Sequence, residues 1–345
     1  MDCQNILLIS PKFRGYEKKI ELGLKDIGYC VKAVFYEEDE HFGLPLVIKA
    51  FLRLFSLILN MVPINNEKSI VLDSNLRQYF LSKFCFSTFN DWLKERVSGK
   101  FDKIIIVKGY GISEKTICAI DAEYKVLYQW DSLIRYSSIK SIYKCFSRVY
   151  TFDKFDSNNG FGNYLPNFFV KDEDYSATLS NDMKYDVLFV GMYTKDRLSK
   201  LREVVEHCNK KGLTHYIRLY RPKSKFVSQK LYKDPLIINA LINSKEYLAL
   251  LSQARSIIEV SHIGQTGMTQ RVLEALDKNK LIICFEPISE LNDLPDRTLV
   301  LRDFFELNKE EFQEKFSQLY VEDHKKDSFI SKYDLNSWLQ TILYP

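Results

Sequence analysis

Short apolar runs and amphipathic helical patterns alternate along this chain, and this alternation limits the folds open to it. Residues 5–10 form an apolar strand pattern, residues 16–27 repeat with a helical period, and residues 30–36 form a second strand pattern. Gly28 follows the helical pattern, at a position where helices commonly end. Further strand patterns at 103–107 and 125–129 continue the series. The alternation predicts an α/β fold with a parallel, doubly wound sheet.

The same alternation begins again in the second half of the chain. A turn-rich stretch at 150–170, with Gly160, Gly162 and Pro166, suits a domain junction. A length of 345 residues is enough for two domains. We therefore expect two Rossmann-like domains, at 1–165 and 166–335, with a C-terminal helix or tail at 336–345. The second series has strand patterns at 185–190, 215–220, 256–260 and 281–285 and helical patterns at 196–210, 244–253 and 268–277.

The composition limits the kinds of partner that the protein is expected to bind. Hydrophobic residues make up 46% of the chain and charged residues 27%, which is typical of a chain that folds throughout. The net charge of +4 does not indicate nucleic-acid binding, which needs a concentrated basic face. The N-terminus runs into the first apolar segment without a basic leader, which favours a cytoplasmic protein. We expect no nucleic-acid partner.

The cysteines are widely spread, and several lie in apolar runs. No two cysteines or histidines have the spacing of zinc ligands. We interpret the cysteines as reduced core thiols, and we expect neither a metal site nor a cofactor. The seven cysteines are Cys3, Cys30, Cys85, Cys118, Cys145, Cys208 and Cys284.

Residues 44–62 interrupt the first domain. Lys49, Arg53, Ser56 and Asn60 recur at a helical spacing, so a helix here would carry a narrow polar stripe and a wide apolar face. The segment is too interrupted to span a bilayer. Two interpretations stay open: a helix packed on its own domain, or an interfacial helix that docks the protein on an anionic membrane.

The segment 261–276 carries the strongest chemical signal. The strand pattern at 256–260 leads into a loop with Gly264 and Gly267, and a helical pattern begins at Met268. Glycines let the backbone approach a ligand, and the free N–H groups and dipole at a helix N-terminus favour phosphate. The sequence therefore predicts an anion site here.

Four side chains extend this predicted anion site. Thr266 or Thr269 would add a hydroxyl group, Arg271 would bind a diphosphate, and the Glu274 carboxylate would accept hydrogen bonds from ribose. The alternative interpretation is that Thr266 caps the helix while Arg271 and Glu274 are solvated surface residues.

Residues 264–276, Gly-Gln-Thr-Gly-Met-Thr-Gln-Arg-Val-Leu-Glu-Ala-Leu, together with 280–283, resemble the donor-binding element of GT-B glycosyltransferases. Bacterial capsule, lipopolysaccharide and spore-coat sugar transferases are the most similar. The resemblance implies two Rossmann-like domains that face each other across a cleft, with a nucleotide sugar bound mainly by the C-terminal domain. It implies a saccharide or lipid-linked acceptor on the N-terminal domain, and no metal.

The resemblance also implies donor-binding residues. Gly267 and Thr269 would lie by the diphosphate and Glu274 by the ribose, while Gly191 and Arg197 come from a segment similar to the family's first strand and loop of this domain. Arg218, Tyr220 and Arg221 end a strand of the same domain, where they would contact the donor or be solvated. The full set of donor candidates is Gly191, Arg197, Arg218, Tyr220, Gly264, Gln265, Thr266, Gly267, Thr269, Arg271 and Glu274.

Two positions depart from the family pattern. Retaining members often carry a glutamate eight positions before the helix glutamate, where this chain has Thr266, and this difference favours inversion. Asn279 stands where a glycine commonly follows the helix, and asparagine also accepts a left-handed backbone.

Inversion needs a general base, for which Asp131 and His262 are the candidates. Asp131 follows a strand pattern at the carboxyl end, where open α/β sheets bind ligands, although an aspartate there also commonly caps a helix. His262, in the glycine loop, would bind the donor or neutralise the leaving group, or serve a structural role.

The acceptor candidates are residues in loops of the first domain. Trp130 is either a contact or a core residue, and Asp153 either contacts the acceptor or caps a turn. The set is Arg14, Lys108, Trp130 and Asp153.

Two other enzyme classes lack their motifs in this sequence. No GxGxxG follows a strand pattern and no GxxxxGK[ST] occurs, which argues against hydride transfer and P-loop chemistry. The prediction is a glycosyltransferase of bacterial surface polysaccharide synthesis, with a peripheral place on the inner face of the membrane as a further hypothesis. A sugar-nucleotide epimerase of the same architecture and a non-catalytic nucleotide-sugar-binding subunit remain as alternatives.

Overall fold

The computed structural model describes residues 3–61, 66–134, 136–170, 183–222, 231–261, 265–286, 288–292, 294–320 and 324–344. The chain divides into two compact units. The N-terminal unit comprises residues 1–167, 262–267 and 335–345, and the C-terminal unit comprises 168–261 and 268–334. The C-terminal segment therefore returns to the first unit, and so does the loop 262–267.

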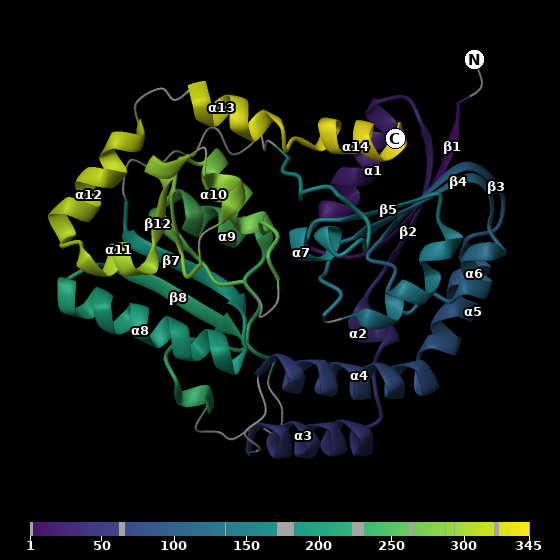
Figure 1. The fold of residues 1–345 in the computed structure, drawn as a ribbon, viewed down its shortest axis with the longest axis horizontal. Helices are drawn as coiled ribbons and strands as arrows, with labels where there is room; N and C mark the ends of the chain where they lie inside the picture. The colour runs from purple at the N-terminus through teal and green to yellow at the C-terminus, as the bar shows by residue number, and fades with distance from the viewer. Residues whose placement is uncertain are drawn as a thin grey trace. The chain divides into compact units, whose positions relative to one another are not determined.

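The N-terminal unit contains a six-stranded parallel sheet in the order β2-β1-β3-β4-β5-β6 (Figure 1). Its strands are β1 (Asn5–Pro11), β2 (Cys30–Tyr36), β3 (Lys100–Val107), β4 (Asp121–Gln129), β5 (Arg148–Thr151) and β6 (Asn163–Tyr164). Its helices are α1 (Tyr16–Asp26), α2 (Glu38–His41), α3 (Leu46–Met61), α4 (Asn66–Phe84), α5 (Phe86–Arg96), α6 (Glu114–Cys118), the 3₁₀ helix η1 (Ser137–Cys145), α7 (Lys154–Asn158) and α14 (Leu335–Leu343).

Helices cover both faces of this first sheet. Leu7 and Ile9 of β1 pack in one core cluster with Leu81 of α4 and Phe89 of α5. On the other side of the sheet, α14 packs against α1, and its Trp338 ring lies 4.8 Å from the ring of Tyr128. Alternate residues of a strand point to opposite faces, so both faces of these strands are apolar.

The C-terminal unit contains a second six-stranded parallel sheet, in the order β12-β11-β10-β7-β8-β9. Counted within the unit, this is the Rossmann order 3-2-1-4-5-6 read from its other edge. The strands are β7 (Tyr185–Met192), β8 (His215–Tyr220), β9 (Ile237–Ile238), β10 (Ala254–Glu259), β11 (Leu281–Cys284) and β12 (Thr298–Val300). The helices are α8 (Lys195–Lys211), α9 (Ser244–Ser252), α10 (Gln270–Asp277), α11 (Leu301–Glu306), α12 (Lys309–Ser317) and α13 (His324–Ser331).

Strand β7 divides the C-terminal core in two. Val187 and Phe189 pack with helices α8, α11 and α12, while Leu188 and Val190 pack with α9, α10 and α13. Helix α8 begins at the N-cap Thr194, whose hydroxyl accepts a hydrogen bond from the Arg197 N–H, and ends at Gly212 with φ 69°. Asn279, after α10, has φ 55°, as its sequence position predicts.

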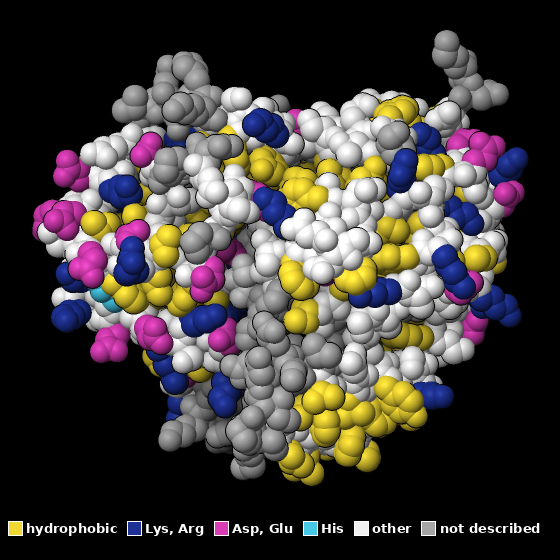
Figure 2. All heavy atoms as spheres, viewed as in Figure 1, with side chains coloured by type: hydrophobic (Ala, Val, Ile, Leu, Met, Phe, Trp, Pro, Cys, Tyr) yellow, Lys and Arg dark blue, Asp and Glu magenta, His cyan; other side chains and the backbone are white. Residues whose placement is uncertain are grey.

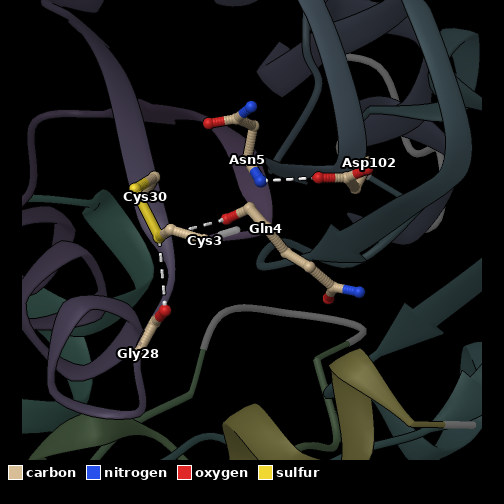
Figure 3. The surroundings of a disulfide bond; sticks show 6 residues. All are labelled: Cys3, Gln4, Asn5, Gly28, Cys30 and Asp102. Atoms are coloured by element: carbon tan, nitrogen blue, oxygen red, sulfur yellow. Dashed lines mark hydrogen bonds between the residues drawn. A yellow bond between two sulfur atoms is a disulfide. The ribbon is translucent and has the colours of Figure 1, made fainter. Parts of the chain in front are cut away.

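The interpretation of every cysteine as a reduced core thiol is wrong. Cys3 is joined to Cys30 by a disulfide with a Cα–Cα distance of 5.7 Å (Figure 3). The parallel register pairs Asn5 of β1 with Cys30 of β2, which brings together two cysteines that are 27 residues apart in sequence. Among the free cysteines, Cys118 is exposed and Cys145 is half-buried, whereas Cys85, Cys208 and Cys284 are buried.

Candidate functional site

The order of the C-terminal sheet locates a ligand site. Strands β7 and β10 are neighbours, and the sheet is extended from β7 by β8 and from β10 by β11. The order of strands therefore reverses between β7 and β10. In open α/β sheets, ligands bind beside the carboxyl ends of the two strands at such a switch point. Here those ends are Gly191 and Met192 of β7 and Glu259 of β10.

Glu259 organises the loop that leaves β10. Its side chain is buried, with 3% exposed, and one carboxylate oxygen accepts a hydrogen bond of 2.8 Å from the Thr269 hydroxyl. The other oxygen accepts one of 3.3 Å from the Ser261 hydroxyl. Arg271 Nε lies 3.5 Å from the same carboxylate. Sequence reasoning missed Glu259, although a carboxylate at the end of an apolar strand pattern was the available signal.

The N-terminus of α10 lies beside Glu259. Thr269 is the N-cap residue, but its hydroxyl donates to Glu259 and makes no capping bond to the helix. The N–H groups of the first turn are therefore not capped by the residue that usually caps them. Such N–H groups, with the helix dipole, form an anion site. Val272, Leu273 and Leu276 fix α10 in the core from its buried face.

Arg271 and Gly191, both donor candidates, lie together. The Arg271 guanidinium donates to the Val190 carbonyl oxygen at 3.2 Å and lies 4.8 Å from the centre of the Phe189 ring. A Cβ atom at Gly191 would lie 2.9 Å from the Phe189 ring and 3.1 Å from Arg271 Nη1. The glycine therefore leaves room for the arginine, which is held by its ion pair. Glu274 lies three residues further along α10, half-buried.

The other donor candidates of this unit differ from one another. Arg197 is buried, and its guanidinium donates to the Val260 oxygen at 2.9 and 3.1 Å and to the Met192 oxygen at 3.4 Å. We correct the expected donor contact of Arg197, because its buried guanidinium instead joins the end of β7 to the residue after β10. Arg218 stacks 4.7 Å over the Tyr216 ring, and Tyr220 is half-buried at the end of β8.

The N-terminal sheet has a polar cluster at its own carboxyl end. Lys108, just after β3, has φ 69°, and its Nζ lies 2.9 Å from the Asp131 carboxylate and 2.6 Å from the Glu38 carboxylate. The Tyr136 ring lies 4.9 Å from the same Nζ. Tyr36, the last residue of β2, is buried, and its hydroxyl has no hydrogen-bond partner within the described part of the chain.

Charge pairing controls the protonation of this cluster. Burial alone lowers the pKa of Lys108, but Asp131, Tyr136 and Glu38 together outweigh burial and hold this pKa well above its usual value. Burial, followed by the charge of Glu38, raises the pKa of Tyr36. Lys108 is therefore a fixed cation that neutralises one of two carboxylates. Sequence reasoning identified Lys108 and Asp131 but missed Tyr36, Glu38 and Tyr136, which lie on other segments.

Trp130 belongs to a cluster of aromatic side chains in the same unit. Its ring lies 5.7 Å from Phe13, 6.1 Å from Tyr16 and 6.3 Å from Tyr128. Arg14 is exposed, with φ 51° and its guanidinium 5.9 Å from the centre of the Phe13 ring. Both acceptor candidates thus lie in loops at the carboxyl end of the sheet, after β1 and β4.

Asp153 has a structural role, in agreement with the capping alternative. It is fully buried and accepts hydrogen bonds from the Asp156 N–H at 3.2 Å, the Thr266 N–H at 2.7 Å and the Thr266 hydroxyl at 2.9 Å. The Gly267 N–H lies 3.4 Å from it. The expected acceptor contact by Asp153 is therefore corrected: its carboxylate binds the 266–267 backbone. Thr266 does not cap α10, since Thr269 is its N-cap residue.

Asp156 holds the loop that carries Asp131. Its carboxylate accepts a hydrogen bond of 2.8 Å from the Leu133 N–H. Burial, reinforced by the Asp153 charge, raises the pKa of Asp156 to about 6, against the opposing effect of the Leu133 hydrogen bond. This loop is therefore anchored by a carboxyl group that titrates near neutral pH.

Three candidates remain to be placed. His262 and Gly264 lie outside the described residues, and Gln265 is half-buried in the N-terminal unit. As for metals, Glu114, Cys118 and Cys145 offer ligand atoms within 4.8 Å of one another, and Lys144 pairs with Glu114 at 2.9 Å. The expectation that no metal is required stays a prediction.

Comparison with known proteins supports the fold. No protein-family model and no curated protein sequence matches the chain. Among solved structures, AviGT4, a glycosyltransferase involved in avilamycin A biosynthesis, is similar with a TM-score of 0.53 over 99% of both chains at 9% identity. The UDP-N-acetylglucosamine 2-epimerase from Rickettsia bellii has a TM-score of 0.48 at 12% identity, over 99% of this chain and 96% of that one.

These findings define a class of fold. Two Rossmann-like units, each with a six-stranded parallel sheet, and the likeness to AviGT4 over the whole chain give this protein the GT-B fold of glycosyltransferases. At 9% identity the structural similarity supports the fold alone.

Proposed function

We propose that this protein is a glycosyltransferase that takes its sugar from a nucleotide-sugar donor. The observation that carries the proposal is the N-terminus of α10 at the switch point of the C-terminal sheet, where Thr269 is turned to the buried Glu259. An uncapped first turn beside the ends of β7 and β10 is suited to a diphosphate.

The donor would lie along α10. Its diphosphate would accept hydrogen bonds from the first-turn N–H groups, with the Arg271 guanidinium as the adjacent positive charge. Glu274 is three residues beyond Arg271, so the two side chains lie on the same side of the helix. We assign the Glu274 carboxylate to the ribose hydroxyls. Gly191 supports this arrangement by leaving space for Arg271.

The acceptor would bind the N-terminal unit near Asp131. In the proposed reaction, Asp131 takes the proton of the acceptor hydroxyl, and the resulting oxygen nucleophile forms a bond to the anomeric carbon. The bond from that carbon to the donor phosphate breaks, and the nucleoside diphosphate leaves with the electron pair. The α10 N-terminus stabilises the charge on the leaving group. Lys108 fixes the Asp131 carboxylate, while Glu38 shares the lysine charge.

Three more specific parts of the proposal rest on the sequence: the biological role, the class of acceptor and the stereochemistry. The likeness of residues 264–276 to capsule, lipopolysaccharide and spore-coat transferases supports a role in bacterial surface polysaccharide synthesis, with a saccharide or lipid-linked acceptor. Thr266, at the position where retaining relatives carry glutamate, supports inversion. Threonine offers the donor no carboxylate, and the Thr266 hydroxyl is already bound to Asp153 and to the Phe155 N–H.

The test is a panel of nucleotide sugars with intact protein and a Glu274→Gln variant. A transferase releases free nucleotide in the presence of an acceptor extract. Losing a carboxylate that bonds ribose should raise the donor Kd roughly 10- to 150-fold, because a hydrogen bond to a charged group contributes about 1.5 to 3 kcal/mol. Glu310→Gln on α12, an exposed glutamate of the same unit, is the control and should leave the Kd unchanged.

Each other outcome rejects a part of the proposal. Conversion of a donor to an isomer, without free nucleotide, would identify an epimerase instead. Thermal stabilisation by a nucleotide sugar without turnover would identify a binding subunit. Equal donor affinity in Glu274→Gln and the intact chain would remove the ribose role, and no response to any nucleotide sugar would reject the proposed function.

A further inference from the structure

One face of helix α3 packs on the core of the N-terminal unit, and the other face is exposed. Ile48 and Leu52 pack against the core of the unit, and Leu59 is buried. The outward face is apolar as well, with Val47 81% exposed and Leu54 58% exposed. Figure 2 shows hydrophobic side chains gathered at the position of α3, near the lower edge of the view. The exposed apolar residues of α3 are Leu46, Val47, Phe51, Leu54, Leu57 and Ile58.

These exposed side chains form a continuous stripe. Positions 47, 51, 54 and 58 recur at helical spacing, which places them on one side of the helix. Phe51 stacks on Phe55 with ring centres 6.5 Å apart and meets Phe80 of α4 at 5.8 Å. Phe80 in turn stacks on Phe84, which is 54% exposed. A contiguous apolar surface of this kind marks an interaction site.

The charges along one edge of the exposed apolar face indicate what covers it, because Lys49 and Arg53 lie at helical spacing from Leu46 and Leu57. Helix α3 has two cations, Lys49 and Arg53, and no acidic residue. Lys49 is exposed, and Lys83 of α4 lies 5.8 Å from the Tyr79 ring, which is itself 55% exposed. An exposed apolar face that is bordered by cations is complementary to a bilayer with anionic headgroups. Pairing with a second copy of α3 would instead bring cation towards cation.

Helix α3 is too short to cross a membrane. The described part of the chain contains no helix that is long and apolar enough to span a bilayer. Helix α3 has 16 residues, and one of its faces is taken by the protein core. An apolar face of this size enters only the boundary between headgroups and acyl chains.

We propose that α3 docks the N-terminal unit on an anionic membrane surface, with the stripe of Val47, Phe51, Leu54 and Ile58 inserted and the exposed Lys49 at the headgroups. The docking is independent of sugar transfer. If the proposed function holds, it favours the lipid-linked class of acceptor, since the acceptor candidates belong to the same unit.

Flotation of the full chain with vesicles tests this proposal. The protein should float with phosphatidylcholine vesicles that contain phosphatidylglycerol, and much less with phosphatidylcholine alone. Leu54→Gln combined with Leu57→Gln should abolish flotation. Leu22→Gln combined with Leu241→Gln is the matched control, because these leucines are equally exposed but lie outside α3, at 57% and 65%. This control should float like the intact chain.

A charge variant separates insertion from headgroup contact. Lys49→Gln should lower the affinity for phosphatidylglycerol vesicles roughly fivefold, the value expected for one lysine at an anionic surface. Equal flotation of the intact chain and the Leu54/Leu57 variant overturns the proposal. So does a failure of the intact chain to float, or a change from dimer to monomer in the Leu54/Leu57 variant, which would identify a second copy as the occupant. Thermal unfolding at the same temperature shows that the variants fold.

Discussion

Asp131 shares its counterion with Glu38, and this sharing determines what the residue is able to do. One lysine Nζ lies within 2.9 Å of both carboxylates, so the cluster has one negative charge more than it has positive charge. The ion pair with Lys108 holds one Asp131 carboxylate oxygen at 2.9 Å from the lysine Nζ. The contact to Glu38 divides the attraction between two partners. The cluster therefore holds the Asp131 side chain in one position.

Asp131→Asn is the residue-scale test of the general base. An amide keeps the size of the side chain but takes up no proton, so kcat should fall by about 100-fold or more while the donor Kd stays unchanged. Steady-state kinetics and donor binding measure the two effects. Asp121→Asn, at the opposite end of the same strand β4 and exposed, is the matched control. Normal turnover by the Asp131 variant would assign the base to another residue.

The residues whose roles needed correction share one property: in the sequence they look like residues available to ligand. Arg197 follows a strand and a loop, as a phosphate-binding arginine would, yet it is buried against the Val260 oxygen. Asp153 follows a strand in the same way, yet it binds the backbone of residue 266, 113 positions away. Tertiary partners at such separations leave no local pattern. Lys108 and Asp131 were predictable because the carboxyl ends of parallel strands meet at one edge of the sheet.

At the scale of elements, the glycine loop has a packing role that its sequence does not predict. Gly267 was expected to let the backbone approach a phosphate. In the structure, a Cβ atom at this position would lie 2.3 Å from the Phe152 carbonyl oxygen, which is closer than any allowed contact. The glycine is needed so that the loop can pack on the segment between β5 and α7. Apolar runs predicted the longer strands, because these depend on local spacing, but the short strands β5, β6, β9 and β12 were not predicted. The packing of the loop depends on distant backbone.

Gly267→Ala should therefore destabilise the protein. The added methyl group forces the loop away from Phe152, at a cost of about 1–3 kcal/mol, and Tm should fall by several degrees. Gly43→Ala is the control, because its Cβ atom would lie at an ordinary 3.7 Å from the Asp39 carbonyl oxygen. Differential scanning calorimetry measures both. An unchanged Tm in Gly267→Ala would contradict the packing role.

At the scale of the whole molecule, the sequence predicted two α/β units but not how their strands are ordered. The first sheet runs β2-β1-β3-β4-β5-β6, while the second has Rossmann order. Both begin with the same β-α-β pattern, so the local signal is the same and the difference lies in which strands pair. The sequence also could not predict that 262–267 and 335–345 belong to the first unit, because this depends on contacts between distant parts of the chain.

Buried titratable groups make the stability of the molecule depend on pH, and Lys280 gives the clearest case. Its side chain is 1% exposed, its Nζ donates to the Ser252 oxygen at 3.2 Å, and burial lowers its pKa from 10.5 to about 8, with Arg255 and Lys278 adding to the effect. Between pH 8 and 10.5 the unfolded chain keeps this proton and the folded chain has lost it. Stability therefore rises with pH through this window, and below pH 8 the buried charge costs free energy.

Lys280→Met removes that cost. At pH 7 the variant should unfold at a higher temperature than the intact chain, by the equivalent of roughly 3 kcal/mol, since each pKa unit corresponds to about 1.4 kcal/mol. The difference should shrink as pH rises towards 10, because the intact chain then folds with a neutral lysine. Lys332→Met, an exposed lysine of the same unit, should show no such trend. If the difference between Lys280→Met and the intact chain stays constant from pH 7 to 10, the buried lysine does not titrate in this window, and its effect on stability is one of packing.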